Sequence, residues 1–129
     1  MNKLQIISVI DEIDKIDNQA WRDTLSYRKL KELEFHDRDR DRNFVKVAQA
    51  SDTFEKFYGN KKYYSATRRS QTYVNEWIAT ESRGKIFLDF ACGNGENAMR
   101  AARNGAALAL GFDISSTSVR NARDLADKE

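Results

Sequence analysis

Two acidic residues and two glycines stand at spacings that can build a nucleotide-binding site. Asp89 lies in a short apolar run, Gly93 and Gly95 follow in a turn of small residues, and Asp113 ends a second apolar run. A turn of small residues lets a ligand approach the backbone, and it aims the N–H groups of the next helix at that ligand. An acid about 20 residues beyond the glycines can accept hydrogen bonds from two ribose hydroxyls. The pattern therefore indicates a site for a nucleotide-type cofactor.

The elements around these residues follow the order of a parallel βαβ unit. Strands are predicted over residues 86–90 and 107–112, and a helix is predicted between them over residues 97–104. Because the first strand is short and apolar, we expect it to be buried on both faces of a parallel sheet. A last helix is predicted to begin after a cap at Ser115 or Ser116.

Helical periodicity dominates the first part of the chain. An amphipathic helix is predicted over residues 3–16 and a second one from a cap at 17–18 to about residue 34, both expected to bury one face. The alternating charges of residues 36–42 neutralise one another, which indicates a solvated turn or helix end. Residues 44–64 are interpreted as an irregular packed segment that mixes aromatic and charged side chains.

A further helix is predicted over residues 66–82, immediately before the first strand. Ser65 or Thr67 can cap its beginning, and Gly84 suits the left-handed conformation that often ends a helix. Its predicted apolar face consists of Tyr73, Val74, Trp77 and Ile78.

The composition excludes an internal disulfide and a zinc site, and it gives no reason to expect a nucleic acid or membrane partner. The 129 residues carry 22 basic and 20 acidic side chains, so the net charge of +2 gives no argument for a nucleic acid or membrane partner. With Cys92 and His36 as the only cysteine and histidine, the chain has no internal disulfide and too few ligands for a zinc site. The apolar start is too short for a signal peptide or a membrane span, so we expect a cytoplasmic protein. The shortage of cysteine and histidine leads us to expect no metal site.

Two cofactors compete for the glycine turn. Residues 93–98 satisfy the G-x-G-x-x-G/A pattern of NAD sites. Asp89 and Glu96 argue against NAD, because carboxylates repel an anionic pyrophosphate in a crevice of low dielectric. S-adenosylmethionine carries an ammonium and a sulfonium and no phosphate, so the same carboxylates would favour it. A methyltransferase, an NAD-dependent oxidoreductase and a non-catalytic fragment are the three interpretations that these residues leave open.

The sequence LDFACGNG, followed by GFDIS, resembles motifs I and II of the class I S-adenosylmethionine-dependent methyltransferases. The family's usual first glycine is an alanine here, which the loop tolerates if that alanine keeps a negative φ. The resemblance implies that Asp113 binds the ribose, Ile114 packs on adenine and Tyr64 closes over the cofactor. It also implies that the methionine part lies among Asp89, Ala91, Cys92, Gly93 and Gly95, with the cysteine acting as a packing residue.

The same resemblance implies a fold and an activity. The expected fold is α/β, a Rossmann-like doubly wound parallel sheet that is truncated after the second strand and its helix and is preceded by N-terminal helices. Residues 1–64 would form a helical cap region, and residues 65–129 would begin the S-adenosylmethionine-binding domain. The expected activity is methyl transfer to a small-molecule acceptor, an expectation based on the near-neutral charge and the lack of a basic groove. The fragment by itself is expected to be inactive, and the sequence indicates no catalytic base and no oligomeric state.

Overall fold

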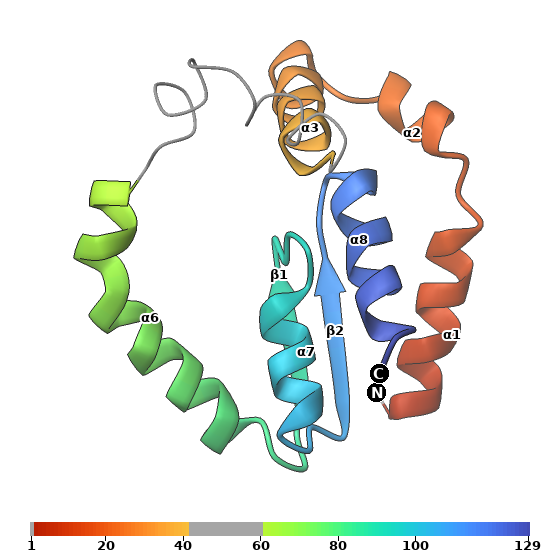
Figure 1. Cartoon of the computed structure of the whole chain (residues 1–129). Coiled ribbons are helices and arrows are strands. Elements are labelled where there is room, and N and C mark those ends of the chain that lie inside the picture. The colour runs from red at the N-terminus through yellow and green to blue at the C-terminus, as the bar shows by residue number, and fades with distance from the viewer. Residues whose placement is uncertain (1, 42–60) are drawn as a thin grey trace. The chain divides into compact units, whose positions relative to one another are not determined.

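The computed structural model describes residues 2–41 and 61–129, without the side chains of residues 61–66 (Figure 1). The chain divides into two compact units, Met1–Glu34 and Phe35–Glu129. Helix α3 (Tyr27–Arg40) contributes residues to both units. This division follows contact density and does not test the predicted functional boundary after residue 64, which stays a prediction.

The first unit contains two helices with side-chain caps at their beginnings. Helix α1 (Lys3–Asp14) begins with a capping box, in which Asn2 Oδ1 accepts from the Gln5 N–H at 3.0 Å and Gln5 Oε1 accepts from the Asn2 N–H at 2.8 Å. Helix α2 (Asn18–Asp23) begins at Asp17, whose Oδ1 accepts from the Gln19 N–H at 2.8 Å. The predictions of a first helix and of a new cap at residues 17–18 are confirmed, with the first helix ending two residues early.

The predicted single helix to residue 34 is wrong, because it is broken between α2 and α3. Thr24 caps the end of α2, and its Oγ1 donates to the Trp21 carbonyl at 2.7 Å. This bond satisfies one of the carbonyls that the end of a helix leaves without an intrahelical partner. After it, α3 runs on to Arg40, so most of the alternating charged segment is helical.

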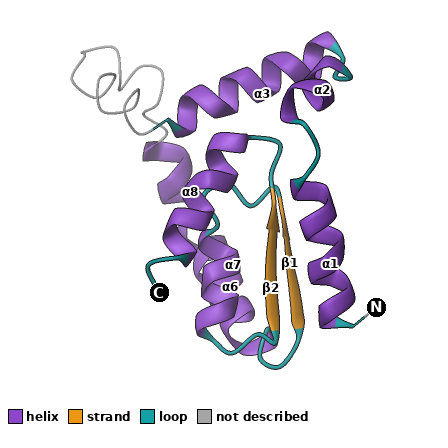
Figure 2. Cartoon of the chain, turned by 90° about the vertical axis from the view of Figure 1, so that its right-hand side faces the viewer, coloured by secondary structure: helices purple, strands orange, loops and turns teal. Residues whose placement is uncertain are grey.

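The second unit is built on two parallel strands, β1 (Ile86–Phe90) and β2 (Leu108–Phe112). They pair in register from Ile86 opposite Leu108 to Phe90 opposite Phe112, so both strands end at the same edge of the sheet. Helix α7 (Glu96–Arg103) connects them and packs against both strands, and Figure 2 shows it on one side of the sheet. The predicted strand, helix and strand are thus confirmed to within one residue at each end.

Burial of β1 on both faces is not observed. Phe87 and Asp89 are half-buried, whereas the side chains of Ile86, Leu88 and Phe90 are 49%, 55% and 85% exposed. The reason is that α7 covers one face of the strand, and no described element buries the alternate side chains on the other face. Within the described residues the sheet therefore behaves as a one-sided layer.

Helix α6 (Lys61–Glu81) precedes β1 and packs against α7. It begins earlier than predicted, so Ser65 and Thr67 lie inside it and neither is its cap. Of its predicted apolar face, Ile78 is buried while the other three side chains are exposed: Tyr73, Val74 and Trp77. Gly84 has the predicted left-handed conformation, with φ +70°.

The last helix, α8 (Ser116–Ala126), begins at the edge where both strands end. Ser115 is its cap, as predicted, and the Ser115 Oγ accepts from the Ser118 N–H at 3.1 Å. Both serines are buried. The Ser115 hydroxyl is therefore a fixed part of the junction between β2 and α8.

Candidate functional site

The loop between β1 and α7 contains three residues with positive φ. Their φ angles are +60° at Ala91, +54° at Gly93 and +83° at Gly95. Gly95 begins α7 without a side-chain cap, and its N–H donates to the Cys92 carbonyl at 3.0 Å. The loop thus folds sharply over the carboxyl end of β1, which is where ligands bind in open α/β sheets.

Ala91 departs from the expectation of a negative φ. Its φ of +60° lies in the left-handed region, where an alanine costs about 1–2 kcal/mol relative to the right-handed conformation. Glycine adopts this conformation without that cost, which gives a physical reason for the glycine usual at this position in the family that the motif resembles. The alanine side chain is exposed, so the strain is confined to the backbone.

Gly95 is required for close packing as well as for conformation. A Cβ added there would lie 2.8 Å from the Cβ of Ala122 in α8. Gly95 is also buried and has positive φ. The start of α7 and the middle of α8 are therefore in contact at a point where no side chain fits.

Asp89 lies beneath this loop in an environment that disfavours its charged form. Burial raises the pKa of the Asp89 carboxyl, the Ala98 backbone N–H opposes that effect, and the negative charge of Asp113 adds to it. One oxygen, Oδ2, is buried and has no hydrogen-bond partner among the described residues. A carboxylate oxygen in this state calls for a donor or a cation.

Asp113 joins the two loops at the carboxyl edge of the sheet. Its Oδ2 accepts from the Gly93 N–H at 2.8 Å, and its Oδ1 accepts from the Ser115 N–H at 2.9 Å. The second bond is the local capping role that an acid at this position can have. A carboxylate has about four lone-pair sites, so these two bonds leave capacity for ligand hydroxyls. The ribose role of Asp113 stays a prediction.

The other predicted site residues have structural surroundings of different kinds. Cys92 is half-buried, and its Sγ lies 2.8 Å from where a Cβ at Gly111 would be, so the thiol packs on the second strand. Burial and the charges of Asp113 and Asp89 raise the pKa of this thiol, which opposes a nucleophilic role. Ile114, the residue after Asp113, is half-buried. The side chain of Tyr64 lies outside the described residues.

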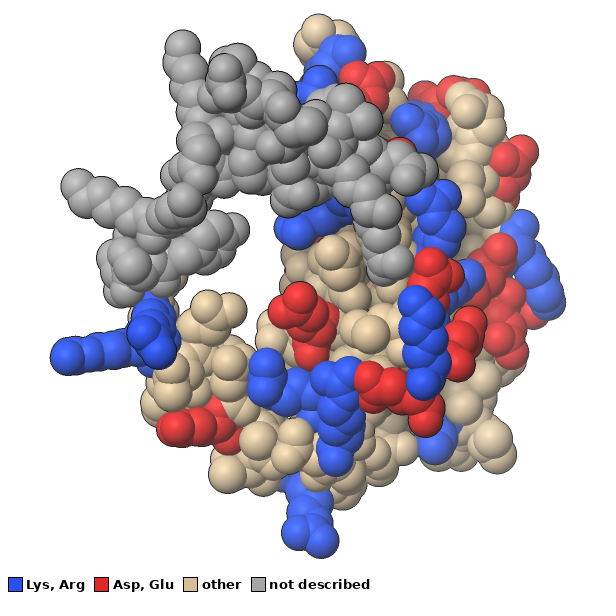
Figure 3. Space-filling model, in the orientation of Figure 1, with Lys and Arg blue, Asp and Glu red and all other residues tan. Residues whose placement is uncertain are grey.

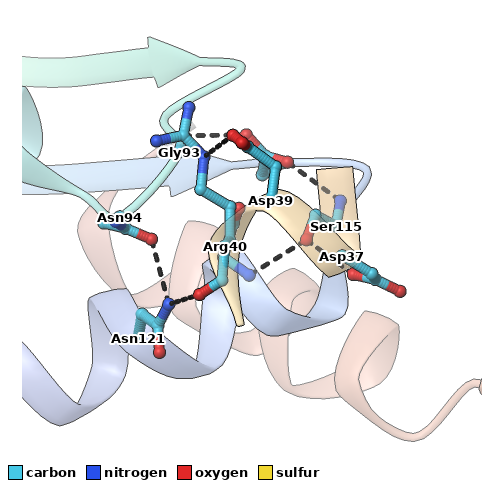
Figure 4. Close-up of polar contacts among 9 residues, drawn as sticks. Asp37, Asp39, Arg40, Gly93, Asn94, Ser115 and Asn121 are labelled. Carbon is cyan, nitrogen blue, oxygen red and sulfur yellow. Dashed lines mark hydrogen bonds and ion pairs between the residues drawn. The ribbon is translucent and has the colours of Figure 1, made fainter. Parts of the chain in front are cut away.

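The end of α3 brings residues to this site that the sequence did not predict. Asp37 Oδ1 accepts from the Ser115 Oγ at 2.6 Å and from the Thr117 N–H at 3.2 Å. The buried Asn121 side chain donates from Nδ2 to the Arg40 carbonyl and to Asn94 Oδ1, both at 3.1 Å (Figure 4). Asp37 is half-buried, so the prediction that its charged segment is merely solvated is wrong at this residue.

No sequence signal marked these contacts, because they link positions about 80 residues apart. Asp37 and Ser115 differ by 78 in number, and Arg40 and Asn121 differ by 81. The alternation of acidic and basic residues indicated neutrality. It carried no information on which acid would meet a buried serine.

The described residues contain no helix that is long and apolar enough to cross a membrane. In the same part of the chain, no group of three or more His, Cys, Asp or Glu side chains could hold a metal ion. Figure 3 shows basic and acidic side chains interspersed over the coloured surface of the face that it presents.

Comparison with known proteins gives one match of limited extent. The chain is 39% identical over 65 residues to the ribosomal protein L11 methyltransferase of Shigella sonnei (strain Ss046), a match that covers 50% of the chain and 22% of that protein. No family model matches the chain. No solved structure matches it. The match supports a relationship to a methyltransferase at this coarse level. S-adenosylmethionine is the usual methyl donor of such enzymes.

The expectation of a small-molecule acceptor is corrected by this comparison. The relative is named for a protein acceptor, ribosomal protein L11. Near-neutral charge and the lack of a basic groove argued against nucleic acid, but they did not distinguish a small molecule from a protein.

Proposed function

We propose that this chain is the donor-binding part of an S-adenosylmethionine-dependent methyltransferase with a Rossmann-like doubly wound fold. The observation that carries the proposal is the pair of carboxylates at the glycine loop, Asp89 beneath it and Asp113 beside it. The relative named as a methyltransferase supports the same class of enzyme.

The residues at the loop fit the charges of S-adenosylmethionine. The partnerless Oδ2 of Asp89 suits the ammonium of the methionine part, because a buried carboxylate oxygen gains most from a cationic donor. Asp113 has lone pairs left for ribose hydroxyls. When bound, the sulfonium supplies an activated methyl group, and the contribution of these residues is to hold and orient it.

The same contacts weigh against a dinucleotide. A pyrophosphate at a glycine loop is bound by backbone N–H groups. Here the Gly93 N–H donates to Asp113, and a second acid lies beneath the loop. An anionic diphosphate would displace a charge-assisted hydrogen bond and then face two carboxylates.

The acceptor class that the comparison supports is a protein, since the relative is named for one. Methyl transfer from a sulfonium is an in-line displacement, and a base is needed only when the acceptor must lose a proton. We assign no catalytic residue among those described. The proposal concerns donor binding.

Isothermal titration calorimetry of the 129-residue chain tests the proposal. We expect S-adenosylhomocysteine to bind and NADH to give no heat of binding. Asp113→Asn should weaken the binding of S-adenosylhomocysteine by about tenfold or more, because hydrogen bonds to a charged group contribute about 1.5–3 kcal/mol. Asp124→Asn, an equal change of charge at an exposed position of α8, is the matched control.

Binding of NADH without a response to S-adenosylhomocysteine would overturn the proposal, as would a chain that binds neither compound. Circular dichroism of each variant shows whether Asp113→Asn retains its helices, since this residue also links the two loops.

A further inference from the structure

The end of α3 is held against both loops of the donor site by side-chain hydrogen bonds. Asp37 bonds to Ser115 and Thr117 at the beginning of α8. Asn121 bonds to the Arg40 carbonyl and to Asn94 in the glycine loop. These bonds fix the last turn of α3 at two points, directly to the start of α8 and, through Asn121, to the glycine loop.

This attachment brings the Arg40 side chain to the glycine loop. Its Nη2 lies 3.9 Å from the position that a Cβ at Gly93 would take, and Figure 4 shows the side chain extending from α3 toward that glycine. The guanidinium has an ion pair with Asp39, Nε to Oδ2, of 3.8 Å, which is too long for a hydrogen bond. Because the Arg40 side chain is 41% exposed, its donors are accessible to a ligand on the loop.

Apart from Arg40, the charged residues described above at the loop are the acids Asp89 and Asp113. Asp89 and Asp113 suit the ammonium and the ribose of the donor, but they repel the carboxylate of its methionine part. A guanidinium has five N–H donors in a planar fork that matches a carboxylate. A donor-binding site with these two acids therefore needs a cation at the point where the carboxylate would lie.

We propose that Arg40 binds the carboxylate of the methionine part of the donor, and that Asp37 and Asn121 are positioning residues that hold it over Gly93. This inference rests on the proposed function. It assigns a binding role to the end of α3, outside the glycine loop and the two strand-end acids.

Two ligands that differ by the amino-acid part test the inference. S-adenosylhomocysteine carries the carboxylate, whereas 5′-methylthioadenosine lacks it and retains the ribose and adenine. Calorimetry with the 129-residue chain should show that Arg40→Gln weakens S-adenosylhomocysteine by about three- to tenfold, a factor set by a partly exposed charge pair. Binding of 5′-methylthioadenosine should stay within about twofold, the change expected when no contact is lost.

The matched control is Arg120→Gln, which removes the same charge from an exposed position on α8 and should change neither affinity. Asn121→Ala, like Arg40→Gln, should reduce the preference for S-adenosylhomocysteine over 5′-methylthioadenosine. Raising the salt concentration should weaken S-adenosylhomocysteine binding more in the wild type than in Arg40→Gln, because salt screens an exposed ion pair.

An Arg40→Gln chain that binds both ligands as well as the wild type would overturn the inference and leave the proposed function standing. Equal losses for the two ligands would also overturn it, since they would mean a general structural role. A wild-type chain that binds neither ligand would instead overturn the proposed function, and the role of Arg40 with it.

Discussion

Replacing Gly95 by alanine should be among the most destabilising single-methyl changes in the second unit. The new Cβ would lie 2.8 Å from the Cβ of Ala122, and the residue would keep a φ of +83°. The left-handed conformation costs an alanine about 1–2 kcal/mol. Overpacking of a buried contact costs about 1–3 kcal/mol more. We therefore expect the free energy of unfolding to fall by about 2–5 kcal/mol.

Gly84 provides a control that separates the two costs. Its φ is +70°, but nothing lies within 4 Å of the position of an added Cβ. Gly84→Ala should therefore cost only the conformational part, about 1–2 kcal/mol. Urea denaturation followed by circular dichroism gives both values. If Gly95→Ala costs no more than Gly84→Ala, the steric reasoning about the contact with Ala122 is wrong.

Two further changes probe the same loop. Ala91→Gly removes the strain of a φ of +60°, about 1–2 kcal/mol, but it also raises the conformational entropy of the unfolded chain, which costs about 0.4–1 kcal/mol of stability. Urea denaturation should therefore show a small net increase in the free energy of unfolding. A decrease above about 1 kcal/mol, the scale of a buried methylene, would mean that the Ala91 methyl group packs against other atoms. The Cys92 thiol, whose pKa is raised by burial and nearby acids, should have less thiolate at pH 8 than an unperturbed thiol. Iodoacetamide should therefore alkylate it more slowly in buffer than in urea, and more quickly as the pH rises; equal rates in buffer and urea would contradict this.

Local pattern was sufficient for the segment that carries the glycine loop. Short apolar runs, small residues and a serine cap predicted β1, α7, β2 and the start of α8 to within about one residue, because each signal lies inside the element that it describes. Gly95 and Asp113 were placed at one edge of the sheet for the same reason, since parallel strands end together.

Other features depended on contacts that no local pattern records. The sign of φ at Ala91 is decided by the fold of the loop, because alanine alone favours a negative value. The exposed side chains of β1 depend on which elements cover the sheet, and the apolar run could not indicate that. The charge pattern around Asp37 predicts solvent exposure, because Ser115, to which it bonds, is 78 residues away in the sequence and leaves no local signal.

The side-chain nitrogen of Asn121 donates to Asn94 and to Arg40, at 3.1 Å each, and so uses both of its hydrogens. The glycine loop and the last turn of α3 are thus joined through the Asn121 side chain, so ligand binding at the loop is coupled to the attachment of α3. Thermodynamic reciprocity then applies: if a ligand on the loop tightens the attachment of α3 by some factor, attachment of α3 must tighten that ligand by the same factor. Where the two events favour each other, any event that releases the end of α3 would accordingly weaken binding at the loop, and it would also carry Arg40 away from Gly93.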